Sequence, residues 1–181
     1  MANDFLTGGL LSPPVAFLLY YLPPPFGASL PLPTLTSTLL AQALAASTAY
    51  GLKSLIYPPS LIFGPACTST LAACFVSETY LTALLTAWCI IPPTMLAPKG
   101  LRPSVARAWI AAGIRVCMTL DGGLTGASMN PMIAAAYYLG GGDLGEGWFT
   151  IYIWGPVAGA TLGAVLAGVL NGGLKKKVKG Q

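Results

Sequence analysis

Four long apolar stretches constrain this chain more than any other feature of its sequence. A helix needs roughly 20 apolar residues to cross the hydrocarbon core of a bilayer. The four stretches reach or approach that length, at residues 35–56, 67–91, 104–120 and 148–170. Only 8% of the 181 residues are charged, against roughly a quarter in an ordinary soluble domain. The sequence therefore predicts one all-α integral membrane domain, residues 1–181.

Two shorter apolar pieces follow related turn phrases. TGGLLSPP precedes the piece at 15–22, and TGASMNPM, residues 125–132, precedes the piece that ends at Leu139. Glycine, asparagine and proline usually mark a surface turn, yet both phrases border apolar stretches. Their shared pattern is Thr-Gly-x-x-x-(Ser or Asn)-Pro.

Each phrase ends as a helix begins. Ser12 and Asn130 stand directly before a proline, which suits a helix N-cap followed by proline at the first helical position. We therefore expect two half-helix motifs, at 8–22 and 125–139. Paired half-helices are typical of inverted repeats whose re-entrant segments meet near the bilayer midplane. The alternative is two interfacial loops, each followed by an amphipathic stub.

The basic residues predict an orientation. The tail at 171–181 carries KKKVK, and we place it on the cytoplasmic-type, positive side. Lys99, Arg102 and Arg107 then fall on that side. Asp121, Asp143 and Glu146 fall on the other, as does Lys53. Membrane lipids, with anionic headgroups near the tail, are the expected partners, whereas no basic stripe with interleaved aromatic residues indicates nucleic acid.

The side chains of the sequence exclude several chemistries. There is no histidine, so histidine-based metal sites and Ser-His or Cys-His catalysis are ruled out. No nucleophile and base pair or phosphate loop is visible, so we expect neither an enzyme nor a cofactor. The cysteines lack C-x-x-C spacing and are interpreted as small buried hydrophobes: Cys67, Cys74, Cys89 and Cys117.

Several of these segments together resemble the aquaporin, or major intrinsic protein, family over nearly the whole chain. The second pore motif of that family, Asn-Pro-Ala-Arg, resembles Asn130, Pro131, Met132 and Ile133, and the first resembles Ser12, Pro13 and Pro14. SETYLT, TLLAQALAAS and WFTIYIWGPVAGA are similar to three of its spans. The resemblance implies an aquaporin-like fold, with about four transmembrane helices and two re-entrant half-helices.

Departures from the family pattern bear on function. Only seven residues precede Gly8, where the family has two spans, so the chain is expected to lack them. Ile133 stands where the family has an arginine, and Met132 is expected either to narrow a pore or to pack as core. Arg115 is a candidate to supply the lost charge. Its alternatives are to extend outward to the surface or to pair with Asp121 or Glu78.

Glu78 has a role that the resemblance implies. It is expected to support the backbone of a re-entrant loop through hydrogen bonds, because backbone groups inside a bilayer need partners within the protein. A proton relay is the alternative.

Two functions follow from the sequence. The first is a channel-inactive, aquaporin-derived structural subunit of a larger membrane complex, such as a photosynthetic or respiratory one. In it, other subunits, pigments or lipids would cover the site of the missing spans. The alternative is a channel for water or small neutral solutes, completed by oligomerisation or partner helices.

Overall fold

The computed structural model describes residues 32–58, 64–95 and 102–179, and every regular element in these ranges is helical. The all-α class is therefore confirmed for this part of the chain. The first expected half-helix motif, with Ser12, Pro13 and Pro14, lies outside the described residues. In chain order the elements are α3 (Leu32–Ile56), α4 (Leu71–Met95), α5 (Pro103–Asp121), α6 (Pro131–Leu139), the π-helical η2 (Thr150–Trp154) and α7 (Gly155–Lys179).

Two helices of the described chain are long and apolar enough to cross a membrane. They comprise Leu71–Ile90 in α4 and Thr150–Leu170 in η2 and α7. Helices α3 and α5 were also predicted to span, but they do not reach the same apolar level. Threonine and serine interrupt α3, and two arginines lie in α5. The two apolar helices support membrane association, and a four-span topology stays a prediction.

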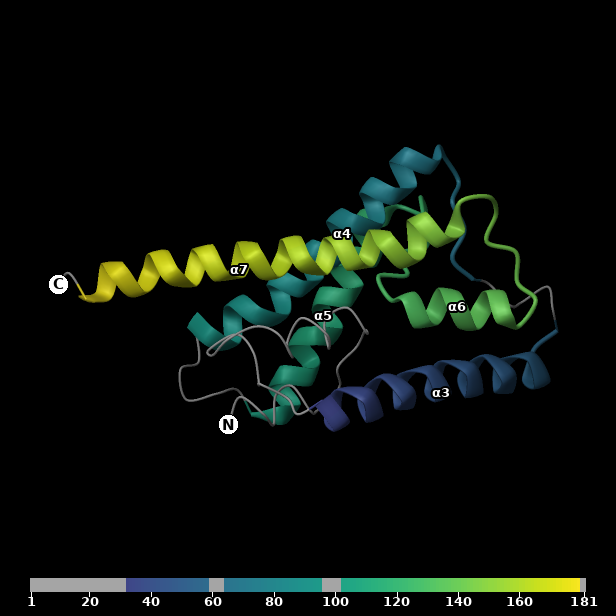
Figure 1. Cartoon of the computed structure of the whole chain (residues 1–181), viewed down its shortest axis with the longest axis horizontal. Helices are drawn as coiled ribbons and strands as arrows, with labels where there is room; N and C mark the ends of the chain where they lie inside the picture. Colours follow the sequence, from purple (N-terminus) through teal and green to yellow (C-terminus); the bar gives the residue numbers. More distant parts are fainter. Residues whose placement is uncertain (1–31, 59–63, 96–101, 180–181) are drawn as a thin grey trace.

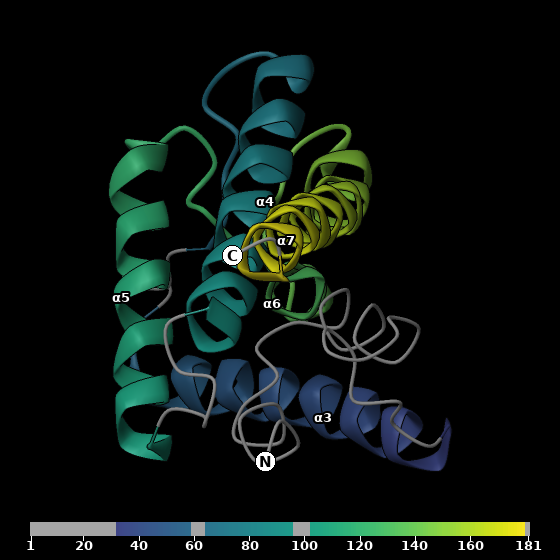
Figure 2. The same ribbon diagram turned by 90° about the vertical axis from the view of Figure 1, so that its left-hand side faces the viewer.

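Helix α4 is the centre of the packing, in contact with α5, η2 and α7. Figures 1 and 2 both show α6 between α7 and α3, and the contacts of α3 are with α6. Predicted and observed helix ends differ at α4, which starts at Leu71 rather than at residue 67. The residues before Leu71 instead bond to the loop that precedes α6.

Small residues bring α4 and α7 into backbone contact. Gly155, Gly159 and Gly163 recur every four residues along α7. A Cβ atom at Gly159 would meet the Thr79 carbonyl oxygen and lie 2.8 Å from Thr82 Cβ. Such close approach through glycine is typical of helices that pack inside membranes.

Two tryptophans join α4 to α5. The Trp88 and Trp109 rings stack with centroids 4.5 Å apart. Each indole N–H donates to the backbone carbonyl oxygen of the other residue, at 3.0 Å in both directions. Gly113 leaves the space for this pair, since a Cβ atom there would lie 2.6 Å from Trp88 Cδ1. The contact fixes the crossing of the two helices.

The outer faces of the helices are apolar. On α3 only Leu35 is buried, and large apolar side chains are exposed on α3, α4, α5 and α7, among them Leu40, Leu44, Leu55, Val76, Val116, Leu120, Leu162, Val165 and Val169. Exposed apolar surface of this extent marks contact with lipid or with other proteins.

Candidate functional site: the loop that begins the half-helix

The loop at residues 122–130 joins α5 to α6 and forms the candidate site. Helix α5 ends at Asp121, and Gly122 follows in the left-handed conformation, with φ of 59°. The chain then turns back to Asn130, whose side-chain oxygen accepts a hydrogen bond from the Met132 amide at 3.0 Å. Pro131 occupies the first turn of α6. The predicted asparagine cap and short helix are both present.

Glu78 of α4 supports this loop from inside the protein. Its side chain is 0% exposed. Oε1 accepts from the Ser128 amide at 2.8 Å, and Oε2 accepts from the Met129 amide at 2.8 Å. The Thr125 hydroxyl lies 2.9 Å from Oε1. One carboxylate therefore satisfies two consecutive amides that no helix or strand pairs.

Asp121 supports the other half of the loop. Its carboxylate accepts from the Thr125 amide at 3.0 Å and from the Gly126 amide at 2.9 Å. The Thr125 hydroxyl lies 2.7 Å from Asp121 Oδ1, and the Ser77 hydroxyl donates to the same oxygen at 3.1 Å. From the sequence, Asp121 is expected only as a charge beyond a span or as a partner of Arg115. The local signal for its role in the loop is an aspartate at a helix end followed by Gly-Gly-x-Thr-Gly, because aspartate commonly bonds backbone amides a few residues on.

The loop backbone is strained where Glu78 holds it. Ala127 and Met129 have φ of 46° and 45°, in the left-handed region, which costs a residue with a Cβ atom roughly 1–2 kcal/mol. Both side chains are buried against Leu81, Leu85 and Cys117. This packing and the Glu78 bonds together stabilise a conformation that the local sequence disfavours.

Tyr152 also bonds the loop. It lies in η2 and is 0% exposed, and its hydroxyl donates to the Thr125 carbonyl oxygen at 3.1 Å. Sequence reasoning did not single out this residue, because a tyrosine in an apolar stretch looks like ordinary core. Only the approach of η2 to the loop gives its hydroxyl a partner.

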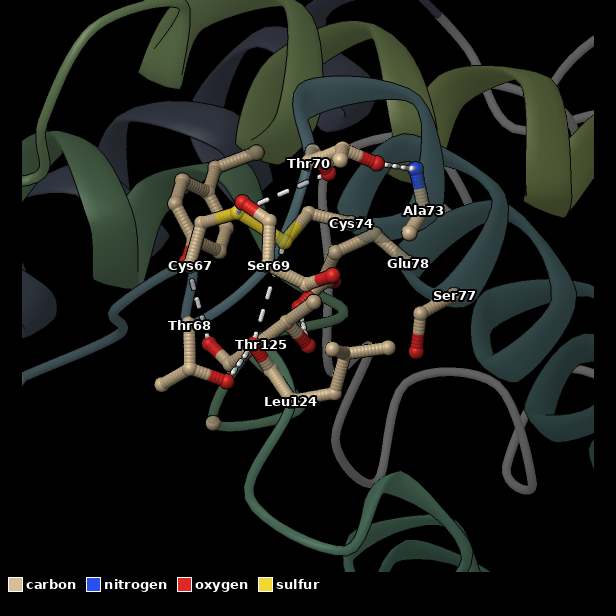
Figure 3. The surroundings of a disulfide bond; sticks show 12 residues. Cys67, Thr68, Ser69, Thr70, Ala73, Cys74, Ser77, Glu78, Leu124 and Thr125 are labelled. Carbon is tan, nitrogen blue, oxygen red and sulfur yellow. Dashed lines mark hydrogen bonds between the residues drawn. A yellow bond between two sulfur atoms is a disulfide. The ribbon is translucent and has the colours of Figure 1, made fainter.

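The structure corrects the prediction for two of the four cysteines. Cys67 and Cys74 form a disulfide, with Cα atoms 5.9 Å apart, rather than serving as separate small hydrophobes. The turn into α4 brings them together, which a spacing of seven residues does not reveal. Cys89 and Cys117 are free, and Cys117 is buried. Figure 3 shows Thr68, next to the disulfide, lying beside Leu124 and Thr125 of the loop.

The remaining predicted residues lie away from the carboxylates. Met132 is half-buried, and Ile133 is 48% exposed on α6. Arg115 is exposed on α5. Asp121 and Glu78 both bond the loop, and a pairing of Arg115 with either carboxylate stays a prediction. The compensation role of Arg115 also stays a prediction.

Comparison with known proteins gives no further assignment. No protein-family model matches this sequence, and no curated protein matches it. The aquaporin resemblance is therefore an inference from the residues quoted above.

Proposed function

We propose that this chain is an aquaporin-derived, channel-inactive structural subunit of a larger membrane complex. The observation that carries the proposal is the replacement at position 133. Ile133 is an exposed apolar side chain in the first turn of α6, directly beyond a loop whose buried hydrogen bonds are intact. The support of a half-helix is kept, while the charged group that the family places beside it is missing.

The loop support favours an aquaporin-like arrangement. Glu78 bonds the Ser128 and Met129 amides, the role that the resemblance implies for this glutamate. Asn130 and Pro131 begin a helix of nine residues, which is too short to cross a bilayer needing roughly 20. A short helix with a buried, fully bonded approach loop suits a re-entrant segment.

The exposed apolar faces favour an assembly. Leu40, Leu44 and Leu55 are exposed on α3, whose contacts within the described chain are mainly with α6. Lipid or another subunit would cover these side chains, and a subunit would also supply partners for half-helix backbone, whose unsatisfied groups cost several kcal/mol each in lipid. Other subunits, pigments or bound lipids would cover this side, and a photosynthetic or respiratory complex is a suitable host.

One observation favours the alternative, a channel for water or small neutral solutes. Asn130 is half-buried at the N-terminus of α6, where the helix dipole is positive. In the resembled family an asparagine amide at this position orients water. Oligomerisation or partner helices would then complete the pore.

The native particle distinguishes the two functions. After mild detergent extraction, native electrophoresis and mass spectrometry of the band should find this chain with foreign subunits at fixed ratio. A particle that contains only this chain would overturn the proposal. Water flux in liposomes then tests the channel, with Asn130→Asp and Met132→Trp expected to reduce flux. Leu139→Ala, at a side chain 80% exposed, is the control that leaves flux unchanged.

A further inference from the structure

The Cys67–Cys74 disulfide joins the segment before α4 to the first turn of that helix. This segment runs beside the loop that begins the half-helix. The Ala66 amide donates to the Thr125 carbonyl oxygen at 3.1 Å, and the Thr68 amide donates to the Leu124 carbonyl oxygen at 2.9 Å. The Thr68 hydroxyl donates to the Leu124 oxygen as well, at 3.1 Å. Residues 66–68 therefore lie along residues 124 and 125 of the loop.

Glu78 bonds the same loop farther along, at the Ser128 and Met129 amides. It follows Cys74 by four residues on α4, so both side chains lie on one face of the helix. The loop is thus held between α4 and residues 66–68, and the disulfide is the covalent link between these two supports. Figure 3 shows this order, with Cys67 and Thr68 on one side of Leu124 and Thr125 and with Glu78 beyond Cys74.

We propose that the Cys67–Cys74 disulfide is an oxidation-dependent lock on loop 122–130. In the reduced chain, residues 66–68 are free to leave the loop, and the amides of Thr125, Ser128 and Met129 are less protected. Oxidation breaks two S–H bonds and forms one S–S bond. The two protons and two electrons pass to a disulfide oxidant, which becomes a dithiol. The lock acts whether the chain conducts or only supports an assembly.

Burial makes this a lock set during maturation rather than a reversible switch. Cys74 is 0% exposed, and its sulfur lies beside the Leu124 carbonyl oxygen, at 3.8 Å. Cys67 is only partly buried, so a reducing thiolate would attack its sulfur and expel Cys74 as a buried thiolate. Thiolates are disfavoured in buried surroundings, and a poor leaving group slows exchange. The folded protein should therefore resist mild reductant.

The disulfide also indicates which side of the membrane loop 122–130 faces. Persistent disulfides form in oxidising compartments. Ser77, three residues after Cys74 on α4, donates a hydrogen bond to Asp121 at the end of α5, and Figure 2 shows the start of α4 and the end of α5 at the same end of the molecule. Arg102 precedes the opposite end of α5. The disulfide and the position of Arg102 both favour a loop end on the non-cytosolic side.

Hydrogen–deuterium exchange of the full chain in mild detergent tests the lock. We expect exchange at Thr125, Ser128 and Met129 to rise about tenfold or more in Cys67→Ser, because local opening becomes easier. The matched control is Ser69→Ala, at an exposed side chain between the two cysteines, which keeps the disulfide and should leave exchange at these amides near that of the wild type. Wild-type protein reduced for several hours supplies the same comparison if Cys67→Ser does not accumulate.

Two results would overturn the proposal. One is faster exchange confined to residues 66–73, with Thr125, Ser128 and Met129 unchanged, which would make the disulfide a support for α4 alone. The other is recovery of Cys67 and Cys74 as free thiols after rapid alkylation of native membranes. Neither result depends on the composition of the native particle, so failure of the lock is distinct from failure of the proposed function.

Discussion

At the scale of single residues, two buried carboxylates hold one short loop. Glu78 reaches it from α4, and Asp121 reaches it from the end of α5. Thr125 lies between them, with its hydroxyl 2.9 Å from Glu78 and 2.7 Å from Asp121. A hydroxyl donates one hydrogen, so it bonds one carboxylate at a time. The amides that Glu78 and Asp121 bond have no helical or strand partner, which makes each carboxylate hard to replace.

We predict that Glu78→Gln destabilises the loop. An amide group of the same shape keeps one oxygen acceptor but turns a donor toward Ser128 or Met129, leaving a buried N–H without an acceptor. The expected loss is about 1–3 kcal/mol in the free energy of unfolding. Tryptophan fluorescence during denaturation in detergent measures it. Glu146→Gln, at an exposed position, is the control, and equal stability of the two variants would contradict the assigned role of Glu78.

At the scale of elements, α4 and α7 depend on glycine at defined positions. Gly159 and Gly163 face carbonyl oxygens of α4 directly, whereas Gly168 on the same helix has nothing within 4 Å of where a Cβ atom would lie. The threonines at this contact, Thr82 and Thr86, are each 1% exposed. Packing here comes from close backbone approach, as it does between helices in lipid, where burial of large side chains gives little net advantage.

We predict that Gly159→Ala lowers the stability of the protein and that Gly168→Ala does not. Both changes improve helix propensity by about 0.8–1 kcal/mol. Only the first places a methyl group against Thr79 and Thr82, so the helices must separate at a cost of roughly 1–3 kcal/mol. Melting temperatures in detergent should fall for Gly159→Ala and stay level or rise for Gly168→Ala. A melting temperature of Gly159→Ala equal to that of Gly168→Ala would show that α4 and α7 are not in close contact.

At the scale of the whole molecule, the described helices show two kinds of surface. Contacts gather around α4 and the loop before α6, while apolar side chains of α3 and α7 point outward. Aromatic residues cluster at the loop end, where Tyr138 stacks on Trp148 at 4.4 Å between centroids. The Trp88–Trp109 pair joins α4 and α5 nearer their other ends. Two separate groups of aromatic side chains, one toward each end of the helices, are typical of the aromatic belts at the two membrane–water interfaces.

We predict that the start of α5 and the loop between α6 and η2 face opposite sides of the membrane. Single cysteines at exposed Ser104 and Glu146, in a Cys89→Ser, Cys117→Ser background, should react with a membrane-impermeant maleimide from opposite sides of sealed vesicles. Glu146→Cys should be labelled from the non-cytosolic side. Labelling of both positions from one side would contradict a spanning α5 followed by a re-entrant α6.

The sequence by itself determined the helical class, the position of the short helix and its asparagine cap. These depend on local properties, since apolar length, proline and a capping side chain act within a few residues of each other. The tertiary structure decided the rest of the site. Tyr152 acquired its role only when η2 approached the loop, because its partner is a backbone carbonyl oxygen 27 residues away in the sequence. The Cys67–Cys74 pair formed because the turn into α4 brings the two sulfurs together, whereas Asp121 bonds amides only four and five residues on and therefore has a local signal.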